Sequence, residues 1–159
     1  MIIKRMIQRI QTIWLMISAI SSSFLIKGGI INFISKEGQK YFTGFSGLYK
    51  LNGHEDVLIT GSVPLSVLII LIPVLSVISI LLFKWRRIQK ILILMVISLS
   101  LCLIILVTYY SYILMKNYDA ALVPGVKMVM PVIITIASIL AYRGILKDDR
   151  LVKSYDRLR

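Results

Sequence analysis

Two long, uninterrupted runs of apolar residues, at 63–83 and 91–114, constrain this chain more than any other feature. Neither run contains an acidic or a basic residue. A helix rises about 1.5 Å per residue and the hydrocarbon core of a bilayer is about 30 Å thick, so each run is long enough to cross a membrane. Across the whole chain 58% of the residues are hydrophobic, against about 45–50% in soluble domains. We therefore expect an integral membrane protein.

Two further apolar segments are shorter and lie near the two ends of the chain. Lys127 and Arg143 flank the last of them, and their charged ends can reach water while their stems cover apolar surface. We therefore expect an all-α membrane protein with four transmembrane helices in a four-helix bundle. The expected organisation is a single domain over 1–159, with spans at about 10–26, 63–83, 91–114 and 126–142, an outer loop at 27–62 and a tail at 143–159.

The distribution of the 19 Lys and Arg residues predicts the orientation of these helices. Most of them lie in the N-terminal arm, in the turn KWRRIQK at 84–90 and in the C-terminal tail. By the positive-inside rule, these segments and both chain termini face the cytoplasm. A net charge of +12 in a soluble protein would suggest nucleic acid. Here the charges flank apolar runs, so the expected partner is a bilayer with anionic headgroups, and no nucleic acid.

The N-terminal segment also fits a second interpretation. A basic start, an apolar stretch and then SAISSS loosely match a cleavable signal peptide. We favour retention, because cleavage would leave three spans.

The outer loop at 27–62 is longer than a simple connection. Within it, YFTGFSGLYKL at 41–51 alternates, and one face of that run would carry Tyr41, Thr43, Phe45, Tyr49 and Leu51. The pair Asn52-Gly53 then precedes a second apolar run, which is a hairpin signal. We therefore expect a small β-hairpin-containing cap in this loop.

Residues with catalytic or ligand-binding chemistry are sparse. Ionisable residues are missing from the interior of the predicted spans, which argues against proton-coupled transport by a single copy. The polar groups inside the spans are serines and threonines, which favour helix packing over a pore lining. His54 is the only histidine, and Cys102, the only cysteine, is interpreted as a buried small apolar residue. We expect no catalytic, cofactor-binding or metal-binding residue, and no cofactor.

The tail RGILKDDRLVKSYDRLR follows the last apolar segment directly. Leu151, Val152, Tyr155 and Leu158 recur in it at helical spacing, which predicts a basic amphipathic helix on the inner face of the membrane. The residues expected to contact lipid or a partner are Arg150, Lys153, Tyr155, Arg157 and Arg159. A charge cluster that only fixes orientation, and a docking surface for another protein, remain as alternatives.

Both ends of the chain resemble those of an uncharacterised bacterial membrane family, domain of unknown function 4293. The resemblance is carried by MIQRIQTIWLM at 6–16 and by the closing RGILKDDRLVKSYDRLR. It implies a four-span protein of the bacterial inner (plasma) membrane with both termini cytoplasmic, and it implies no activity. Because the family pattern starts near Met6, either Met1 or Met6 could be the natural start.

Together these features predict a non-catalytic integral inner-membrane protein, an accessory or scaffolding subunit of a larger complex. Its expected partner is another membrane protein. The alternative is a small transport or lipid-handling protein that acts as an oligomer. A membrane-bound enzyme that uses His54 or Asp119 is a third hypothesis.

Overall fold

The structure is a computed structural model that describes the backbone at residues 2–52, 55–83 and 85–157 and the side chains at 10–52, 56–83 and 85–148. It contains helices, a 3₁₀ turn and strands in the following order: α1 (Ile2–Ser23), β1 (Ile31–Ser35), β2 (Lys40–Gly44), β3 (Gly47–Asn52), β4 (Glu55–Gly61), α2 (Val63–Leu81), α3 (Arg86–Tyr118), β5 (Ala120–Val123), η1 (Val126–Val129) and α4 (Met130–Arg157).

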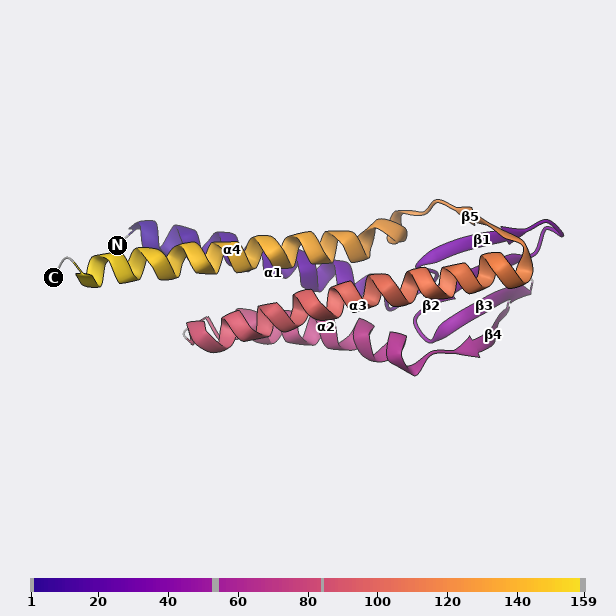
Figure 1. Ribbon diagram of the computed structural model, residues 1–159, viewed down its shortest axis with the longest axis horizontal. Coiled ribbons are helices and arrows are strands. Elements are labelled where there is room, and N and C mark those ends of the chain that lie inside the picture. The colour runs from indigo at the N-terminus through magenta and orange to yellow at the C-terminus, as the bar shows by residue number, and fades with distance from the viewer. Residues whose placement is uncertain (1, 53–54, 84, 158–159) are drawn as a thin grey trace.

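The molecule is elongated, with its helices along the long axis and its strands gathered at one end (Figure 1). Helix α1 begins and helix α4 ends at the end opposite the strands. Helix α1 packs against both α2 and α4, and α3 completes the bundle by packing against the same two helices. Helix α3 is 33 residues long and continues past the bundle to lie beside the strands.

The strands form a five-stranded antiparallel sheet in the order β4-β3-β2-β1-β5. Strands β1 to β4 are a meander, while β5 comes from the distant connection between α3 and α4 and pairs with β1. The end of α3 and strands β1, β2 and β5 are in contact, so α3 covers one face of the sheet. In the described part of the chain, no helix covers the opposite face (Figure 1).

The expectation of an all-α fold with four spanning helices is therefore wrong. The protein is a mixed α/β fold in which the expected hairpin cap is part of a five-stranded sheet. Three helical segments are long and apolar enough to cross a membrane: Val63–Leu81, Arg86–Tyr118 and Val126–Asp148. In the described part of α1 the apolar helix runs over Ile10–Ser23, which is shorter than a span of about 20 residues.

Two apolar clusters hold these layers together. The larger one joins the inner face of the sheet to the helices, with Phe33 and Leu48 buried together with Leu65, Leu103 and Leu114. The smaller one lies toward the opposite end of the bundle and contains Leu15, Ile93, Ala141 and Ile145. The sheet and the helices thus share a core and form one structural unit.

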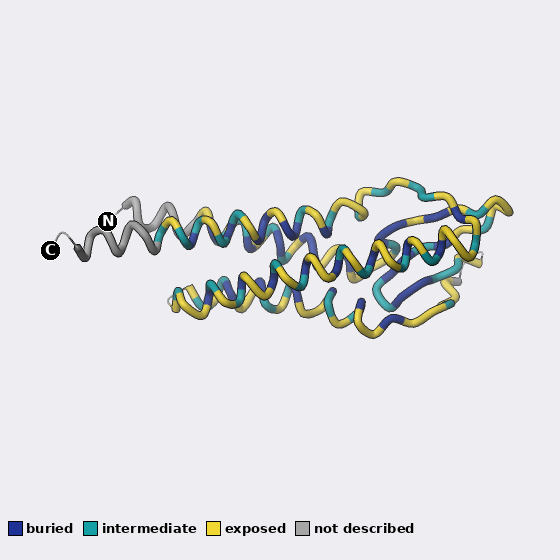
Figure 2. The backbone as a smooth tube through the Cα atoms, in the orientation of Figure 1, coloured by how far each residue is buried: buried dark blue, intermediate teal, exposed yellow. Residues whose placement is uncertain are grey.

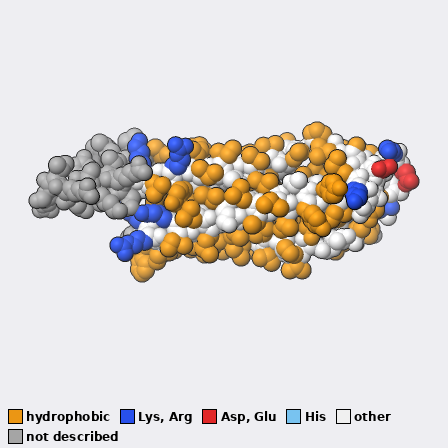
Figure 3. Space-filling model, viewed as in Figure 1, with side chains coloured by type: hydrophobic (Ala, Val, Ile, Leu, Met, Phe, Trp, Pro, Cys, Tyr) orange, Lys and Arg blue, Asp and Glu red, His pale blue; other side chains and the backbone are white. Residues whose placement is uncertain are grey.

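The outside of the bundle is also apolar. Figure 2 shows that exposed positions follow the outer faces of the helices, and Figure 3 shows that hydrophobic side chains cover much of the described surface on the side in view. Lys and Arg side chains gather near both ends of this apolar band. Such a surface fits a hydrocarbon environment, in which exposed apolar side chains carry no cost.

Candidate functional site

Hydroxyl groups from three helices meet inside the bundle. Ser18 of α1 lies 3.4 Å from Ser76 of α2 and 3.2 Å from Ser138 of α4, measured between hydroxyl oxygens, and all three side chains are fully buried. Ser76 and Ser138 donate to the carbonyls of Ile72 and Ile134 in their own helices. The Ser18 hydroxyl has one proton, which it donates to one of these two neighbours at a time. The three hydroxyl protons are therefore used within the bundle rather than offered to a ligand.

A second hydroxyl contact joins α4 to α3. Thr135 Oγ1 lies 3.0 Å from Ser100 Oγ, and both side chains are buried. Ser100 donates in turn to the carbonyl of Ile97. Small polar residues that bond one another and their own backbone let helices approach closely in lipid. These contacts fit the interpretation of the span hydroxyls as packing groups.

A cavity of about 740 Å³ opens at the end of the bundle opposite the sheet. Its lining comes from α1, α2, α3, α4 and the residues just after α2. On its wall Gln11 Nε2 donates to Asp148 Oδ2 at 2.9 Å, and Gln89 Nε2 donates to the carbonyl of Ser79 at 3.0 Å. Arg86 adds a positive charge to the lining. The polar groups of this cavity mainly link the helix ends to one another.

The uncovered face of the sheet carries a row of side chains across the strands. The row runs through Val123, Asn32, Phe42, Tyr49 and Leu58, as the strand register places them opposite one another. The rings of Phe42 and Tyr49 are stacked, with centroids 5.0 Å apart and planes 8° from parallel. Offset stacking of this kind presents a flat apolar surface of fixed shape.

A glycine sets the position of the Tyr49 ring. Gly44 precedes the turn between β2 and β3, and a Cβ there would lie 2.8 Å from Cε2 of Tyr49. The tyrosine ring therefore occupies the space that any larger residue at this position would need. It covers a glycine that would otherwise weaken the strand.

Apolar side chains also extend to the edge of this sheet. On β4, the outermost strand, Val57 and Leu58 are 46% and 48% exposed. Ile34 and Leu51 are exposed on β1 and β3. Among the described strands, β4 has a neighbour only on its β3 side. The sheet therefore offers a partner a face that carries the stacked Phe42 and Tyr49 and exposed apolar side chains, together with an open strand edge.

A polar cluster lies where α3 ends beside the sheet. Ser35 Oγ donates to the carbonyl of Tyr118 at 2.9 Å, and the exposed Lys36 and Asp119 form an ion pair at 3.1 Å. The buried Tyr41 stacks near Tyr118, with ring centroids 4.9 Å apart, and donates to Gln39 Oε1. Burial raises the pKa of the Tyr41 phenol, and Tyr118 and Glu37 raise it further. These contacts attach the sheet to the end of α3.

The residues predicted for lipid or partner contact cannot be placed in this geometry. Arg150, Lys153, Tyr155 and Arg157 belong to helix α4, but their side chains, and the whole of Arg159, lie outside the described residues. His54 lies outside them as well. Among the described residues there is no group of three or more His, Cys, Asp or Glu side chains that could hold a metal ion.

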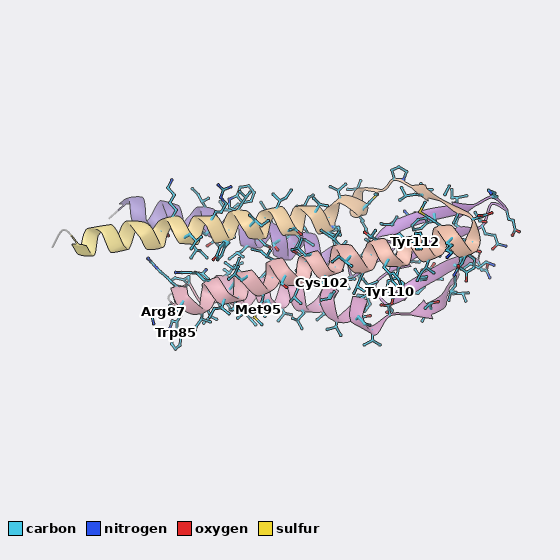
Figure 4. The ribbon with its side chains drawn as sticks, in the orientation of Figure 1. Trp85, Arg87, Met95, Cys102, Tyr110 and Tyr112 are labelled. Carbon is cyan, nitrogen blue, oxygen red and sulfur yellow. The ribbon has the colours of Figure 1, made fainter. Side chains whose placement is uncertain are left out.

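Cys102 differs from its prediction. It is exposed on the outer surface of α3 rather than buried, on the same helix as Met95, Tyr110 and Tyr112 (Figure 4). The sequence offered no signal for this, because both faces of α3 are apolar within the run. The row on the sheet was also missed, since the sequence pattern did not resolve the turn between Phe42 and Tyr49 or the strands β1 and β5.

Comparison with known proteins gives one match. The sequence model of a family described as a domain of unknown function (DUF4293) matches residues 7–158, nearly the whole chain. Neither the curated proteins nor the solved structures contain a match.

Proposed function

Because the chain belongs to the domain of unknown function 4293 family, whose description assigns no activity, we propose a function from its surfaces. The protein is a non-catalytic integral membrane protein that acts as an accessory or scaffolding subunit of a larger membrane complex. The observation that carries this proposal is the uncovered face of the sheet, with Phe42 stacked on Tyr49 and the open strand β4 beside it.

This surface has the chemistry of a protein-binding site. Aromatic residues are enriched where proteins bind one another, because they bury a large area at a small cost in side-chain entropy. An open strand supplies backbone hydrogen bonds to an added strand, while exposed side chains such as Leu58 give specificity. A lipid-facing role does not require a stacked pair of aromatic rings on a sheet.

The proposed location is the bacterial inner membrane, with both termini in the cytoplasm and the sheet on the outer side. Two observations support this orientation. Helix α1 begins and α4 ends at the same end of the molecule, and the sheet is at the other end. The basic turn at 84–90 and the basic tail belong to the end that carries the termini, as the positive-inside rule requires of the cytoplasmic side.

Site-specific photocrosslinking in the native membrane tests the proposal. A photoreactive residue is placed at Tyr49 on the sheet face, and at the exposed Ile105 on the outer surface of α3 as a control. We expect one protein adduct of defined mass from position 49 and only lipid adducts from position 105. The adduct should be lost when Phe42→Ser and Leu58→Ser remove the apolar row around the probe.

The same tagged protein is then purified in mild detergent, both full-length and truncated after Tyr142. A stoichiometric partner that matches the adduct from position 49 would support the role as a subunit. Loss of that partner on truncation would assign part of the contact to the tail. If the protein is purified without any partner and position 49 gives no protein adduct, the proposal is contradicted.

A further inference from the structure

A groove of about 720 Å³ lies on the outside of the bundle between α1 and α2. Its two walls face each other along the helices, with Ala19 and Ser23 on α1 and with Pro73 and Val77 on α2. Residues four apart lie on one face of a helix, so each pair forms a continuous wall. The small side chains of Ala19 and Ser23 leave the space between the helices open.

The groove is apolar along its length, although it contains a serine. Ser23 Oγ donates to the carbonyl of Ala19 at 2.8 Å, so its hydrogen-bonding capacity as a donor is used within its own helix. The exposed side chains of Ile20, Phe24 and Ile26 extend the apolar lining toward the sheet. A hydrocarbon chain could therefore lie in the groove without covering an unpaired donor.

The end of the groove nearest the sheet is positively charged. Lys27 and Lys127 are the only charged residues among its described lining residues. The Lys127 ammonium donates to the carbonyl of Lys27, which holds the two residues together although they belong to distant parts of the chain. Between described residues the structure contains a single ion pair, Lys36 with Asp119, so neither groove lysine is neutralised by a described carboxylate.

The backbone after Lys27 is shaped to admit the Lys127 side chain. Gly28 has a left-handed φ of 72°, which residues with a Cβ rarely adopt. A Cβ at this position would also lie 3.1 Å from Lys127 Nζ. The turn at Gly28 therefore leaves room for the ammonium group at the end of the groove.

We propose that this groove binds one anionic phospholipid, with an acyl chain between α1 and α2 and its phosphate on Lys27 and Lys127. The occupant must be a lipid because the walls are hydrocarbon and open onto the apolar outer surface of the bundle. It is anionic because the charged residues that line the groove are Lys27 and Lys127, at the end where its apolar lining stops. This inference concerns a different surface from the sheet and is independent of the proposed subunit role.

Native mass spectrometry of the full-length protein, delipidated in detergent and titrated with phosphatidylglycerol or phosphatidylcholine, tests this site. We expect one retained phosphatidylglycerol per chain and weaker binding of phosphatidylcholine. Lys27→Gln and Lys127→Gln each remove one ammonium group. Each variant should weaken phosphatidylglycerol binding about fivefold, which is the contribution expected of one cation near an anionic headgroup. Lys40→Gln with Lys116→Gln, two exposed lysines outside the groove, is the matched control and should leave binding unchanged.

Two further variants separate the parts of the site. Ala19→Phe fills the groove and should weaken both lipids, while Lys127→Arg keeps the charge and should retain binding, which also shows that position 127 tolerates substitution. Equal loss in the groove and control lysine variants, or equal affinity for the two lipids, would overturn the proposal. So would displacement of phosphatidylglycerol by inorganic phosphate at millimolar concentration, because the site would then bind the anion alone.

Discussion

Ser18 and Ser138 lie 120 positions apart in the chain, yet their hydroxyl oxygens are 3.2 Å apart inside the helix bundle. This contact joins α1 to α4, the two helices that begin and end the chain, and Ser76 adds α2 on the other side of Ser18. In lipid the packing of helices depends on close approach and on such hydrogen bonds, since hydrophobic burial between helices gains little there.

The Ser18–Ser138 contact should be measurable as a coupling energy. In a double-mutant cycle of Ser18→Ala and Ser138→Ala, we expect a coupling of about 0.6 kcal/mol, the average for hydrogen bonds between membrane helices. The free energy of unfolding would be measured in mixed micelles of mild detergent and dodecyl sulfate. Thr108→Ala is the control, because the exposed Thr108 bonds only the carbonyl of Ile104 in its own helix. The control cycle combines Ser18→Ala with Thr108→Ala. If the Ser18–Ser138 coupling energy is no larger than that of the control cycle, the contact is not formed.

Gly47 should be the least replaceable glycine of the sheet. It has φ 139°, and a Cβ there would lie 2.0 Å from the carbonyl oxygen of Thr60 on the neighbouring strand. Gly38 also has positive φ, but a Cβ there would meet nothing within 4 Å. We therefore expect Gly38→Ala to cost about 1 kcal/mol from backbone conformation alone, and Gly47→Ala to cost more because β3 and β4 must also separate. Hydrogen exchange of the amides in β3 and β4 measures the difference, and equal protection in the two variants would contradict it.

The stability of the sheet should fall at alkaline pH through Tyr41. The pKa of this phenol is raised from its usual value of 10.0, first by burial and then by Tyr118 and Glu37. Folding therefore favours the neutral phenol, so its contribution is complete below pH 10 and is lost as pH rises from there through the raised pKa. Between pH 8 and about 11.5, the midpoint of thermal unfolding should fall less steeply in Tyr41→Phe than in the original protein. Tyr49→Phe, on the open face, is the comparison, and identical pH profiles for all three proteins would refute the assignment.

The basic tail predicts binding to anionic lipid or to a partner. Replacing Arg150, Lys153, Arg157 and Arg159 with Gln removes four cations, each contributing about 1 kcal/mol near an anionic surface. We expect weaker association of the protein with anionic liposomes or with its co-purified partner, measured by flotation and by pull-down at fixed salt. Unchanged binding in both assays would show that the charges of the tail only fix the orientation of the protein in the membrane.

The helices of this fold could be predicted from the sequence, but most of their ends could not. Helix α2 begins at Val63, as its apolar run does, because Ser62 accepts a hydrogen bond from the amide of Leu65 and starts the helix there. Helix α3 extends well beyond its predicted span at both ends. An apolar run marks only the part of a helix that lies in hydrocarbon, and the ends that reach water or the sheet have no such signal.

Only part of the sheet could be predicted, because the sequence pattern did not show where the chain turns and which strands pair. Strands β3 and β4 pair from Asn52 and Glu55 onward, which confirms the hairpin predicted beside Asn52-Gly53. The run 41–51 was predicted as one alternating face, but it turns back between Gly44 and Gly47. This turn places Tyr49 opposite Phe42 rather than beside Tyr41, so the face assigned to Tyr49 was wrong. A one-residue change in register moves every side chain to the other face.

The remaining strands carry too little local information to be found from the sequence. Strand β5 has four residues and β1 has five, and they pair with each other from distant parts of the chain. Such strands are stable only in the context of their neighbours. The aromatic stack of Phe42 on Tyr49 was missed because the turn between Gly44 and Gly47 was not recognised. The groove was missed because α1, α2 and Lys127, which line it, come from separate parts of the chain.

The direction of the strands has a consequence for symmetry. The strands run roughly along the long axis of the molecule, as the helices do (Figure 1). Two copies inserted the same way into one bilayer are related by rotation about the membrane normal, which leaves the direction of β4 unchanged. Antiparallel pairing of two β4 edges would therefore require one copy to be inverted in the membrane. Insertion in one direction thus excludes the antiparallel form of the edge-to-edge pairing that an open strand otherwise permits.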